Sequence, residues 1–276
     1  MTRAFSLLAA LLAVGALAGP AGAAFPGRNG LIAYTVECCS GSDLTDFATR
    51  VVAPDGSHAR LIAGTADRVV FSPDGTRLLW GDAFGFGLFV RRMDGRQHER
   101  RISSMPSFLA DWSPDGRKIV FTRFPGDSSF VLRIRQDGHG RRLIRGLDPA
   151  WSVRNEIAFG NENGGVDVIR PDGSNLRSLV AVGSEPDWSP DGRRVAYGAH
   201  GSVWTVRADG TGKRRLRLGR SPSFSPDGHR IVYIGPRGLV RIMGAAGRRS
   251  HRLPYRNNRG SDNFTFLRPD WQPLPR

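Results

Sequence analysis

Short apolar and polar alternations separated by turn sequences recur along almost the whole chain. One repeated unit is an aromatic residue, then Ser-Pro-Asp-Gly, then a β-branched or aromatic run. Its copies are FSPDGTRLLW (71–80), WSPDGRKIVF (112–121), WSPDGRRVAY (188–197) and FSPDGHRIVY (224–233), with WSVRNEIAF (151–159) as a shorter copy. Pro fixes φ in a type I turn, and Ser supplies a side-chain acceptor. Each copy therefore predicts strand, turn, strand.

A second unit follows each of these at a near-constant distance. Its copies are VVAPDGSHARLI (51–62), VRRMDGRQHERRI (90–102), LRIRQDGHGRRLI (132–144), DVIRPDGSNLRSLV (167–180) and WTVRADGTGKRRLRL (204–218). A sixth copy, VRIMGAAGRRSHRL (240–253), has Gly and Ala in place of Asp-Gly. Asp-Gly between apolar flanks predicts a hairpin with a two-residue type I′ loop.

The spacing of the aromatic anchors indicates the architecture. Phe71, Trp112, Trp151, Trp188 and Phe224 stand 41, 39, 37 and 36 residues apart. Four short antiparallel strands repeated at roughly 40 residues are typical of a β-propeller blade. The alternative is a two-sheet sandwich, but sandwiches do not repeat their sequence at a blade's period.

The two ends of the repeated region each carry half a repeat. FPGRNGLIAYT (25–35) aligns with the strand after the turn, and RPDWQP (268–273) aligns with the strand before it. We therefore expect the segment around Trp271 to supply the innermost strand of a first blade made otherwise from residues 31–64, which leaves no open sheet edge. The predicted fold is all-β: a six-bladed β-propeller of four-stranded antiparallel blades. The blades are expected at 25–64 with 266–273, 65–104, 105–146, 147–181, 182–218 and 219–254.

The first 23 residues have the pattern of a secretory signal peptide. Arg3 precedes an apolar run from Ala4 to Ala18, and small residues follow up to Ala23. A membrane anchor is the alternative, but about 15 apolar residues are short for a bilayer. We expect cleavage after Ala23 or Ala24, a propeller domain over residues 24–276, secretion to the periplasm, envelope or exterior, and no membrane span after cleavage.

The chain is strongly basic, with 40 Lys and Arg against 25 Asp and Glu and a formal net charge of +15. Nucleic acid is the usual partner of such a charge, but an exported chain seldom meets it. Arginine pairs fall near the start of each outermost strand, at Arg100-Arg101, Arg141-Arg142, Arg214-Arg215 and Arg248-Arg249. They protect exposed sheet edges from aggregation, or they bind an anionic polymer.

Cys38 and Cys39 are adjacent and are the only cysteines. In an oxidising compartment they form a strained vicinal disulfide or pair between molecules, and otherwise they stay reduced. The sequence leaves these alternatives open. A bond between adjacent residues closes no sizeable loop and would stabilise the fold little.

At these repeats the chain resembles the TolB-type six-bladed propellers, which carry the same W-S-P-D-G turn and the same late D-G hairpin. The resemblance covers essentially the whole region after the signal. It implies a periplasmic platform that binds proteins of the cell envelope. TolB itself has an α/β domain before its propeller, whereas here the predicted signal runs directly into the first repeat, so we expect no such domain.

Three carboxylates precede the aromatic anchor in alternate blades: Asp111, Asp187 and Asp270. Because innermost strands line the axial channel, they can converge into a ring suited to Ca²⁺, which would be the only cofactor. The alternative is that they hydrogen-bond neighbouring backbone groups.

The loops opposite the repeated turns vary in sequence and are the other candidate sites. They are Glu37–Phe47, Asp82–Gly87, Pro125–Ser129, Asn161–Gly165 and Tyr255–Phe264, with Asp43, Asp46, Asn161, Asn163 and Asp262 as candidate binding residues. The alternative is that they are solvated connections.

No G-x-S-x-G, H-E-x-x-H or P-loop motif occurs in the sequence. We therefore expect a monomeric, non-enzymatic interaction module with a protein partner in the cell envelope. A hydrolase or lyase with a cation at the axial channel, and a wall protein that binds an anionic polymer, are the alternatives.

Overall fold

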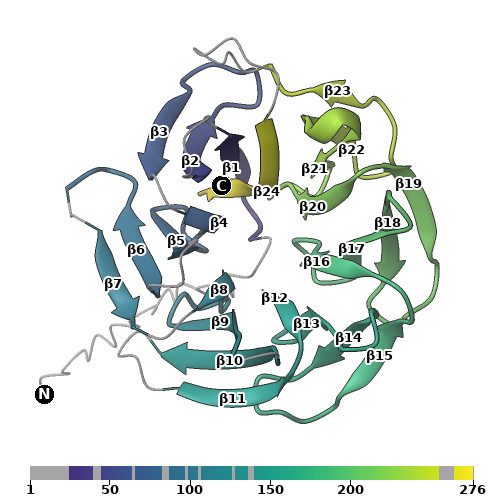
Figure 1. Cartoon of the computed structure of the whole chain (residues 1–276). Helices are drawn as coiled ribbons and strands as arrows, with labels where there is room; N and C mark the ends of the chain where they lie inside the picture. Colours follow the sequence, from purple (N-terminus) through teal and green to yellow (C-terminus); the bar gives the residue numbers. More distant parts are fainter. Residues whose placement is uncertain are drawn as a thin grey trace, which may run out of the picture.

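The computed structural model describes residues 25–39, 45–63, 66–82, 87–96, 99–104, 107–125, 128–135, 140–254 and 264–275. Within these segments the strands form six four-stranded antiparallel sheets, which stand as blades around one axis (Figure 1). The predicted all-β, six-bladed propeller is confirmed. The predicted signal peptide lies outside the described residues and stays a prediction.

Each blade runs from an innermost strand at the axis to an outermost strand at the rim. Blade one is β24 (Phe264–Leu274), β1 (Arg28–Cys39), β2 (Thr45–Val52) and β3 (Arg60–Ala63). Blade two is β4 (Ala66–Phe71), β5 (Arg77–Asp82), β6 (Leu88–Arg92) and β7 (Arg100–Ser103). Blade three is β8 (Phe108–Trp112), β9 (Lys118–Arg123), β10 (Phe130–Arg135) and β11 (Gly140–Arg145).

The second half of the ring follows the same order. Blade four is β12 (Leu147–Trp151), β13 (Ile157–Gly160), β14 (Val166–Ile169) and β15 (Arg177–Val180). Blade five is β16 (Ser184–Trp188), β17 (Arg194–Ala199), β18 (Ser202–Arg207) and β19 (Arg214–Leu218). Blade six is β20 (Arg220–Phe224), β21 (Arg230–Ile234), β22 (Val240–Gly244) and β23 (His251–Arg252), with a short 3₁₀ turn, η1 (Pro236–Gly238), before β22.

Blade one joins the two ends of the described chain. Strand β24 pairs antiparallel with β1, and the register sets Trp271 opposite Ile32 and Asp270 opposite Ala33. Tyr34 therefore lies in the same sheet as Trp271, as the half repeats predict. This pairing closes the ring and leaves no free edge between blades one and six.

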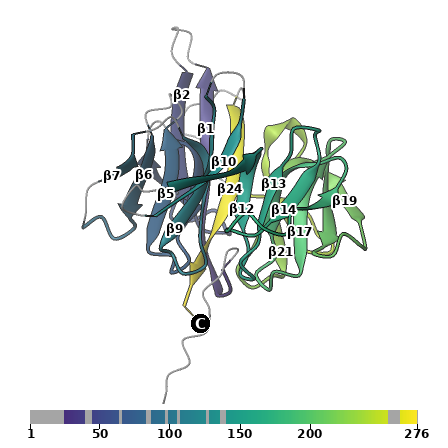
Figure 2. The same ribbon diagram turned by 90° about the horizontal axis from the view of Figure 1, so that it is seen from below.

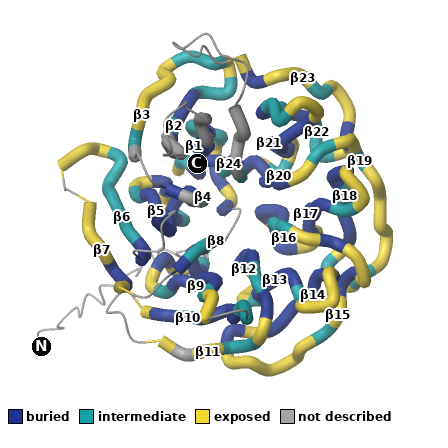
Figure 3. The backbone as a smooth tube through the Cα atoms, in the orientation of Figure 1, coloured by how far each residue is buried: buried dark blue, intermediate teal, exposed yellow. Residues whose placement is uncertain are grey.

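The core consists of thin apolar layers between neighbouring blades. Trp112, Trp151 and Trp188 are at most 1 % exposed, and each packs against strands of an adjacent blade. Exposed residues collect on the outermost strands, whereas the inner strands are buried (Figure 3). A ring packed in this way holds its surface turns on a rigid base.

The Ser-Pro-Asp-Gly segments form turns, as predicted. In blade two the N–H of Gly75 donates to the Ser72 carbonyl, and the N–H of Ser72 donates to the Arg77 carbonyl. The Ser72 hydroxyl and the N–H of Thr76 both donate to Asp74 Oδ1. The Asp thus fixes the turn from inside.

The type I′ prediction is wrong for the Asp-Gly hairpins that the structure describes. Such a loop needs positive φ at both central residues, but Gly56 has a φ of 87° whereas Asp55 is not among the residues with positive φ. The N–H of Gly56 donates to Ala53, and the N–H of Ala53 donates to Ser57. The loop therefore has three residues, a type I turn followed by a left-handed Gly. Asp55 accepts from the N–H and hydroxyl of Ser57, which favours Asp there.

The two kinds of turn lie on one face of the ring, which we call the turn face. Main-chain hydrogen bonds link them within a blade, from Ala208 to Arg193 and from Ala245 to His229. The second-to-third strand connections lie on the opposite face, the loop face, where β1 and β2 project furthest (Figure 2). This division agrees with the sequence analysis.

Candidate functional site

The axial channel is lined by the residues that precede the aromatic anchors. They are acidic in blades one, three and five (Asp270, Asp111 and Asp187) and uncharged in blades two, four and six (Val70, Ala150 and Ser223). Each carboxylate accepts the anchor's N–H from the next blade: Phe71 to Asp270 at 2.8 Å, Trp151 to Asp111 at 2.7 Å and Phe224 to Asp187 at 2.8 Å. The aspartates therefore tie the blades in pairs. This matches the expected alternative of bonding to neighbouring backbone.

These three carboxyl groups have perturbed pKa values. Burial raises the pKa of Asp111 to about 7 and that of Asp270 to about 6, and it raises the pKa of Asp187 well above its usual value. The Arg68 guanidinium acts in the opposite direction on all three. Asp111 and Asp270 therefore take up protons at mildly acidic pH.

The residues three positions before each anchor form a second layer of side chains. In five blades this residue has positive φ: Leu109 (52°), Asp148 (55°), Glu185 (53°), Ser221 (50°) and Arg268 (25°). The pairing of the innermost strand shifts register beside each of them. A β-bulge redirects a side chain in this way.

Arg268 makes use of this bulge to cross the axis. Its guanidinium forms an ion pair with Asp148 of blade four, on the opposite side of the ring, and another with Glu185 Oε1 of blade five at 3.3 Å. Glu185 Oε2 also accepts from the N–H of Ser221 at 2.7 Å. One arginine thus links blades on both sides of the channel.

Phe25 lies at the other end of the same channel. Its side chain is 5 % exposed and belongs to the core cluster of Trp112 and Trp151. Together with the three aspartates and Arg68 it lines a cavity of about 20 Å³, which is room for about one water molecule. The channel is therefore filled by the protein's own side chains at this level.

These residues do not present a metal-binding set. Across the described part of the chain, no group of three or more His, Cys, Asp or Glu is placed to hold a metal ion. Asp111, Asp187 and Asp270 are engaged with main-chain N–H groups instead. The Ca²⁺ ring stays a prediction.

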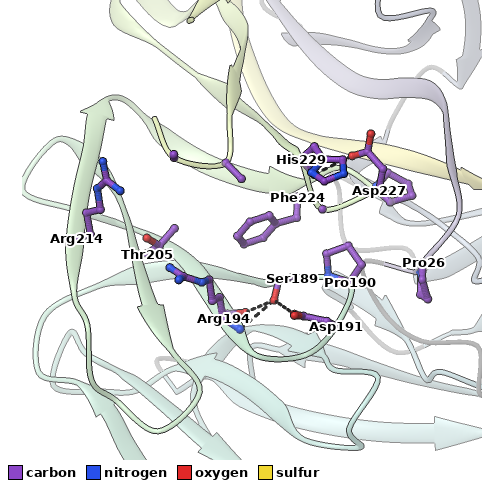
Figure 4. Close-up of a pocket in the computed structure, with 14 residues that line it drawn as sticks. Pro26, Ser189, Pro190, Asp191, Arg194, Thr205, Arg214, Phe224, Asp227 and His229 are labelled. Carbon is purple, nitrogen blue, oxygen red and sulfur yellow. Dashed lines mark hydrogen bonds between the residues drawn. The ribbon is translucent and has the colours of Figure 1, made fainter. Parts of the chain in front are cut away.

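A much larger hollow, of about 650 Å³, opens on the turn face between blades five and six (Figure 4). Its apolar lining comes from Pro190, Phe224, Pro226, Ala245 and Ala246, with Pro26 at one side. Its polar lining comes from Asp191, Arg194, Thr205, Arg214, Asp227 and His229, together with Ser189. A hollow of this size and mixed character fits a small group or a few side chains.

The sequence explains why this blade junction is open. Between blades two and three the Arg77 guanidinium lies 4.6 Å from the centroid of the Trp112 ring and covers it. The corresponding pair here is Arg194 and Phe224, in which the anchor is smaller. The blade-six hairpin also carries Ala245-Ala246 where blade five has Ala-Asp. Smaller side chains on both walls leave the space.

The two acids in the lining are held by their own turns. Burial acts to raise the pKa of Asp191, but hydrogen bonds from the Ser189 hydroxyl and the Arg193 N–H lower it overall. Asp227 has a lowered pKa for the same reasons and also accepts from Asn29 of blade one at 2.8 Å. Both therefore stay ionised at neutral pH, and their hydrogen bonds stabilise the turns. Arg194, Arg214 and His229 are exposed around the hollow.

The loop-face candidates have mixed outcomes. Asn161 closes its own turn: its Oδ1 accepts from Asn163 and Gly165, and its Nδ2 donates to Asp167. Asn163 is exposed. Asp43 and Asp262 lie outside the described residues, and so do the side chains of Asp46, Cys38 and Cys39, although strand pairing sets Cys38 opposite Asp46. Binding through these loops stays a prediction.

The turn-face hollow was not predicted from the sequence, because the repeated turns make this face look uniform. The signal was present in two departures from the repeat, Phe224 in place of Trp and GAAG in place of a D-G turn.

The 3.6-residue helical pattern is absent from the repeats, and no helix among the described residues has the length and apolarity needed to cross a membrane.

Comparison with known proteins supports the fold. No protein-family model and no curated sequence matches this chain. Among solved structures it is similar to TolB from Acinetobacter baumannii, with a TM-score of 0.72, 17 % identity, and 90 % of this chain and 68 % of that one covered. The fold is thus that of a TolB-type propeller.

Two further structures share the architecture. A chain of the nidogen/laminin complex gives a TM-score of 0.70 at 12 % identity, with 88 % of this chain and 98 % of that one covered. An oligogalacturonate lyase in complex with manganese gives 0.52 at 15 % identity, with 78 % and 74 % covered. At these identities the likeness concerns the fold, because one fold hosts many functions.

Proposed function

We propose that this chain is a non-enzymatic interaction module of the TolB type, exported as a monomer, which binds a protein partner of the cell envelope through the hollow on its turn face. The observation that carries the proposal is the 650 Å³ hollow between blades five and six. It combines an apolar base with exposed basic side chains, which is the composition of a protein-docking site.

The rest of the ring supports a binding role. Axial aspartates, the Arg268 ion pairs and the β24–β1 pairing connect the blades, so the walls of the hollow are held in place before a partner arrives. Preformed surfaces lose less conformational entropy on binding. The predicted export signal and the likeness to the solved TolB structure support a partner in the envelope.

A pull-down with a matched pair of variants tests this proposal. The chain from residue 24 onward, tagged at its C-terminus, is incubated with envelope extract, and bound proteins are identified by mass spectrometry. Ala246→Trp places an indole at the wall of the hollow. Asp172→Trp places an indole at the corresponding hairpin position of blade four, away from the hollow.

We expect a partner that the wild type and Asp172→Trp retain and Ala246→Trp loses at least tenfold. Circular dichroism and thermal melting establish that both variants are folded. A partner retained equally by both variants would show that the hollow is not the docking site.

A further inference from the structure

The positive charge of this protein is concentrated in one sector of the ring. Residues 25–192 contain 21 Arg and Lys and 21 Asp and Glu, so this part is formally neutral. Residues 193–254 contain 14 Arg and Lys but only two acids, Asp209 and Asp227, which leaves +12 of the chain's +15. We call residues 193–254 the basic sector. It comprises blades five and six apart from strand β16 and the turn that follows it, which carry Glu185, Asp187 and Asp191.

The basic sector supplies most of the lining of the turn-face hollow, and the rest comes from Pro26 and from the blade-five turn, Ser189 to Asp191. Arg193 and Arg194 follow the blade-five turn, Arg207 and Lys213 flank the blade-five hairpin, and Arg214 begins the rim strand β19. Strand β19 has four of its five residues exposed. It adjoins β23 along the rim (Figure 1), and Arg217 Nε donates to the Gly247 carbonyl of blade six at 2.9 Å. The charged surface is therefore continuous across both blades.

The two acids of this sector offset only two of its 14 positive charges. Asp209 accepts from the N–H and hydroxyl of Thr211, and these hydrogen bonds lower its pKa. Asp227 is held by its own turn and by Asn29. Because like charges gathered on one surface repel each other, a negatively charged partner relieves a cost that the folded chain carries alone.

The apolar base of the hollow narrows the choice of partner. Pro190, Pro226 and Phe224 line the same hollow as Arg194 and Arg214. A polymer of sugars or phosphates matches the charge but supplies no aliphatic side chain to cover this base. An acidic protein segment that carries an apolar residue matches both features.

We infer that the basic sector binds an acidic protein segment whose carboxylates contact Arg194, Arg214 and the neighbouring arginines while one apolar side chain enters the hollow. This inference rests on the proposed function and adds the chemistry of the partner.

The test uses defined probes and the folded chain from residue 24 onward. Four fluorescein-labelled probes are titrated by anisotropy: an acidic ten-residue peptide of Asp and Glu with one central Leu, the same peptide with Gly for Leu, a poly-L-glutamate, and a heparin oligosaccharide. Variants are Arg194→Gln with Arg214→Gln, and a control with Arg100→Gln. Arg100 begins β7 as Arg214 begins β19, and their cross-strand partners Val90 and Thr205 correspond.

We expect the Leu peptide to bind most tightly and to lose about tenfold with Gly for Leu, the effect of one buried aliphatic side chain. The double variant loses about tenfold and Arg100→Gln less than twofold. Affinity falls as salt rises from 50 to 300 mM. Tighter binding of heparin or poly-L-glutamate than of the Leu peptide, or equal affinity for the Leu and Gly peptides, overturns the inference in favour of a polyanion site.

The two proposals fail separately. If the envelope partner is lost by Ala246→Trp but retained by the double arginine variant, the docking site stands and its acidic chemistry is wrong. If the Leu peptide binds as expected while no envelope protein depends on Ala246, the chemistry stands and the proposed cellular role is wrong.

Discussion

Replacing Asp111 by Asn changes how the stability of the ring depends on pH. Asp111 ties blade three to blade four, and burial raises its pKa from an ordinary 3.8 to about 7. The folded protein therefore binds more protons than the unfolded chain between about pH 4 and pH 7. Stability contributed by this group falls as pH rises through that window and is constant above it.

The size of the effect follows from the two pKa values. Between pH 5 and pH 8, a carboxyl that titrates near 7 when folded and near 3.8 when unfolded costs the wild type about 2.5 kcal/mol of stability. Asn carries no charge, and the hydrogen bond it loses costs the same at both pH values. The free energy of unfolding of Asp111→Asn relative to wild type should therefore rise by about 2.5 kcal/mol from pH 5 to pH 8.

Urea denaturation at pH 5 and pH 8, followed by tryptophan fluorescence, measures this difference. Asp172→Asn is the control, because hydrogen bonds from Ser174 lower the pKa of Asp172 and it stays ionised at both pH values. Its relative stability should be the same at both pH values. An Asp111→Asn difference that is also constant would refute the account of the axial carboxyls.

Two further substitutions probe ring closure and the axial ion pairs. Gly75 and Gly116 hold the same turn position with φ of 66° and 64°, but a Cβ on Gly75 would meet the Pro273 carbonyl of the closing strand at 1.9 Å, whereas on Gly116 its nearest neighbour is the flexible Arg77 side chain at 3.1 Å. Gly75→Ala should cost roughly 1–3 kcal/mol more than Gly116→Ala in urea unfolding, and equal losses would argue against a closing strand beside this turn. Arg268→Met leaves the buried Asp148 carboxylate unpaired and should cost about 3–5 kcal/mol. Arg145→Met, which breaks the exposed pair with Glu162, should cost less than about 1 kcal/mol. Similar melting curves for these two variants would show that Arg268 does not stabilise the ring.

The fold could be predicted from the sequence because each blade repeats the same local turn and packing signals. Ser-Pro-Asp-Gly, the aromatic anchor and the half repeats at Tyr34 and Trp271 specify turns, packing and closure without long-range information. The hairpin loop type was wrong because Asp-Gly serves both a type I′ loop and a type I turn followed by a left-handed Gly. Neighbours along the chain do not distinguish them.

The site was less predictable. The alternation of Asp with Val, Ala and Ser at the axis was visible, but the bond from each Asp to the next blade's N–H depends on strand placement. The bulge that carries Arg268 across the axis to Asp148 has no local sequence signal. The hollow could be recognised in the sequence only from the differences between Phe224 and Ala245-Ala246 and the residues at the same positions in other blades. The basic sector could be recognised only from the net charge of each blade.

Hydrogen–deuterium exchange in the presence of the captured partner tests most directly where this protein binds. With the partner bound, we expect slower exchange in the turns at 189–194 and 226–230 and in the hairpin at 244–248, and no change in the loop at 161–165. Protection of the loop at 161–165, with the blade-five and blade-six turns unchanged, would contradict the account.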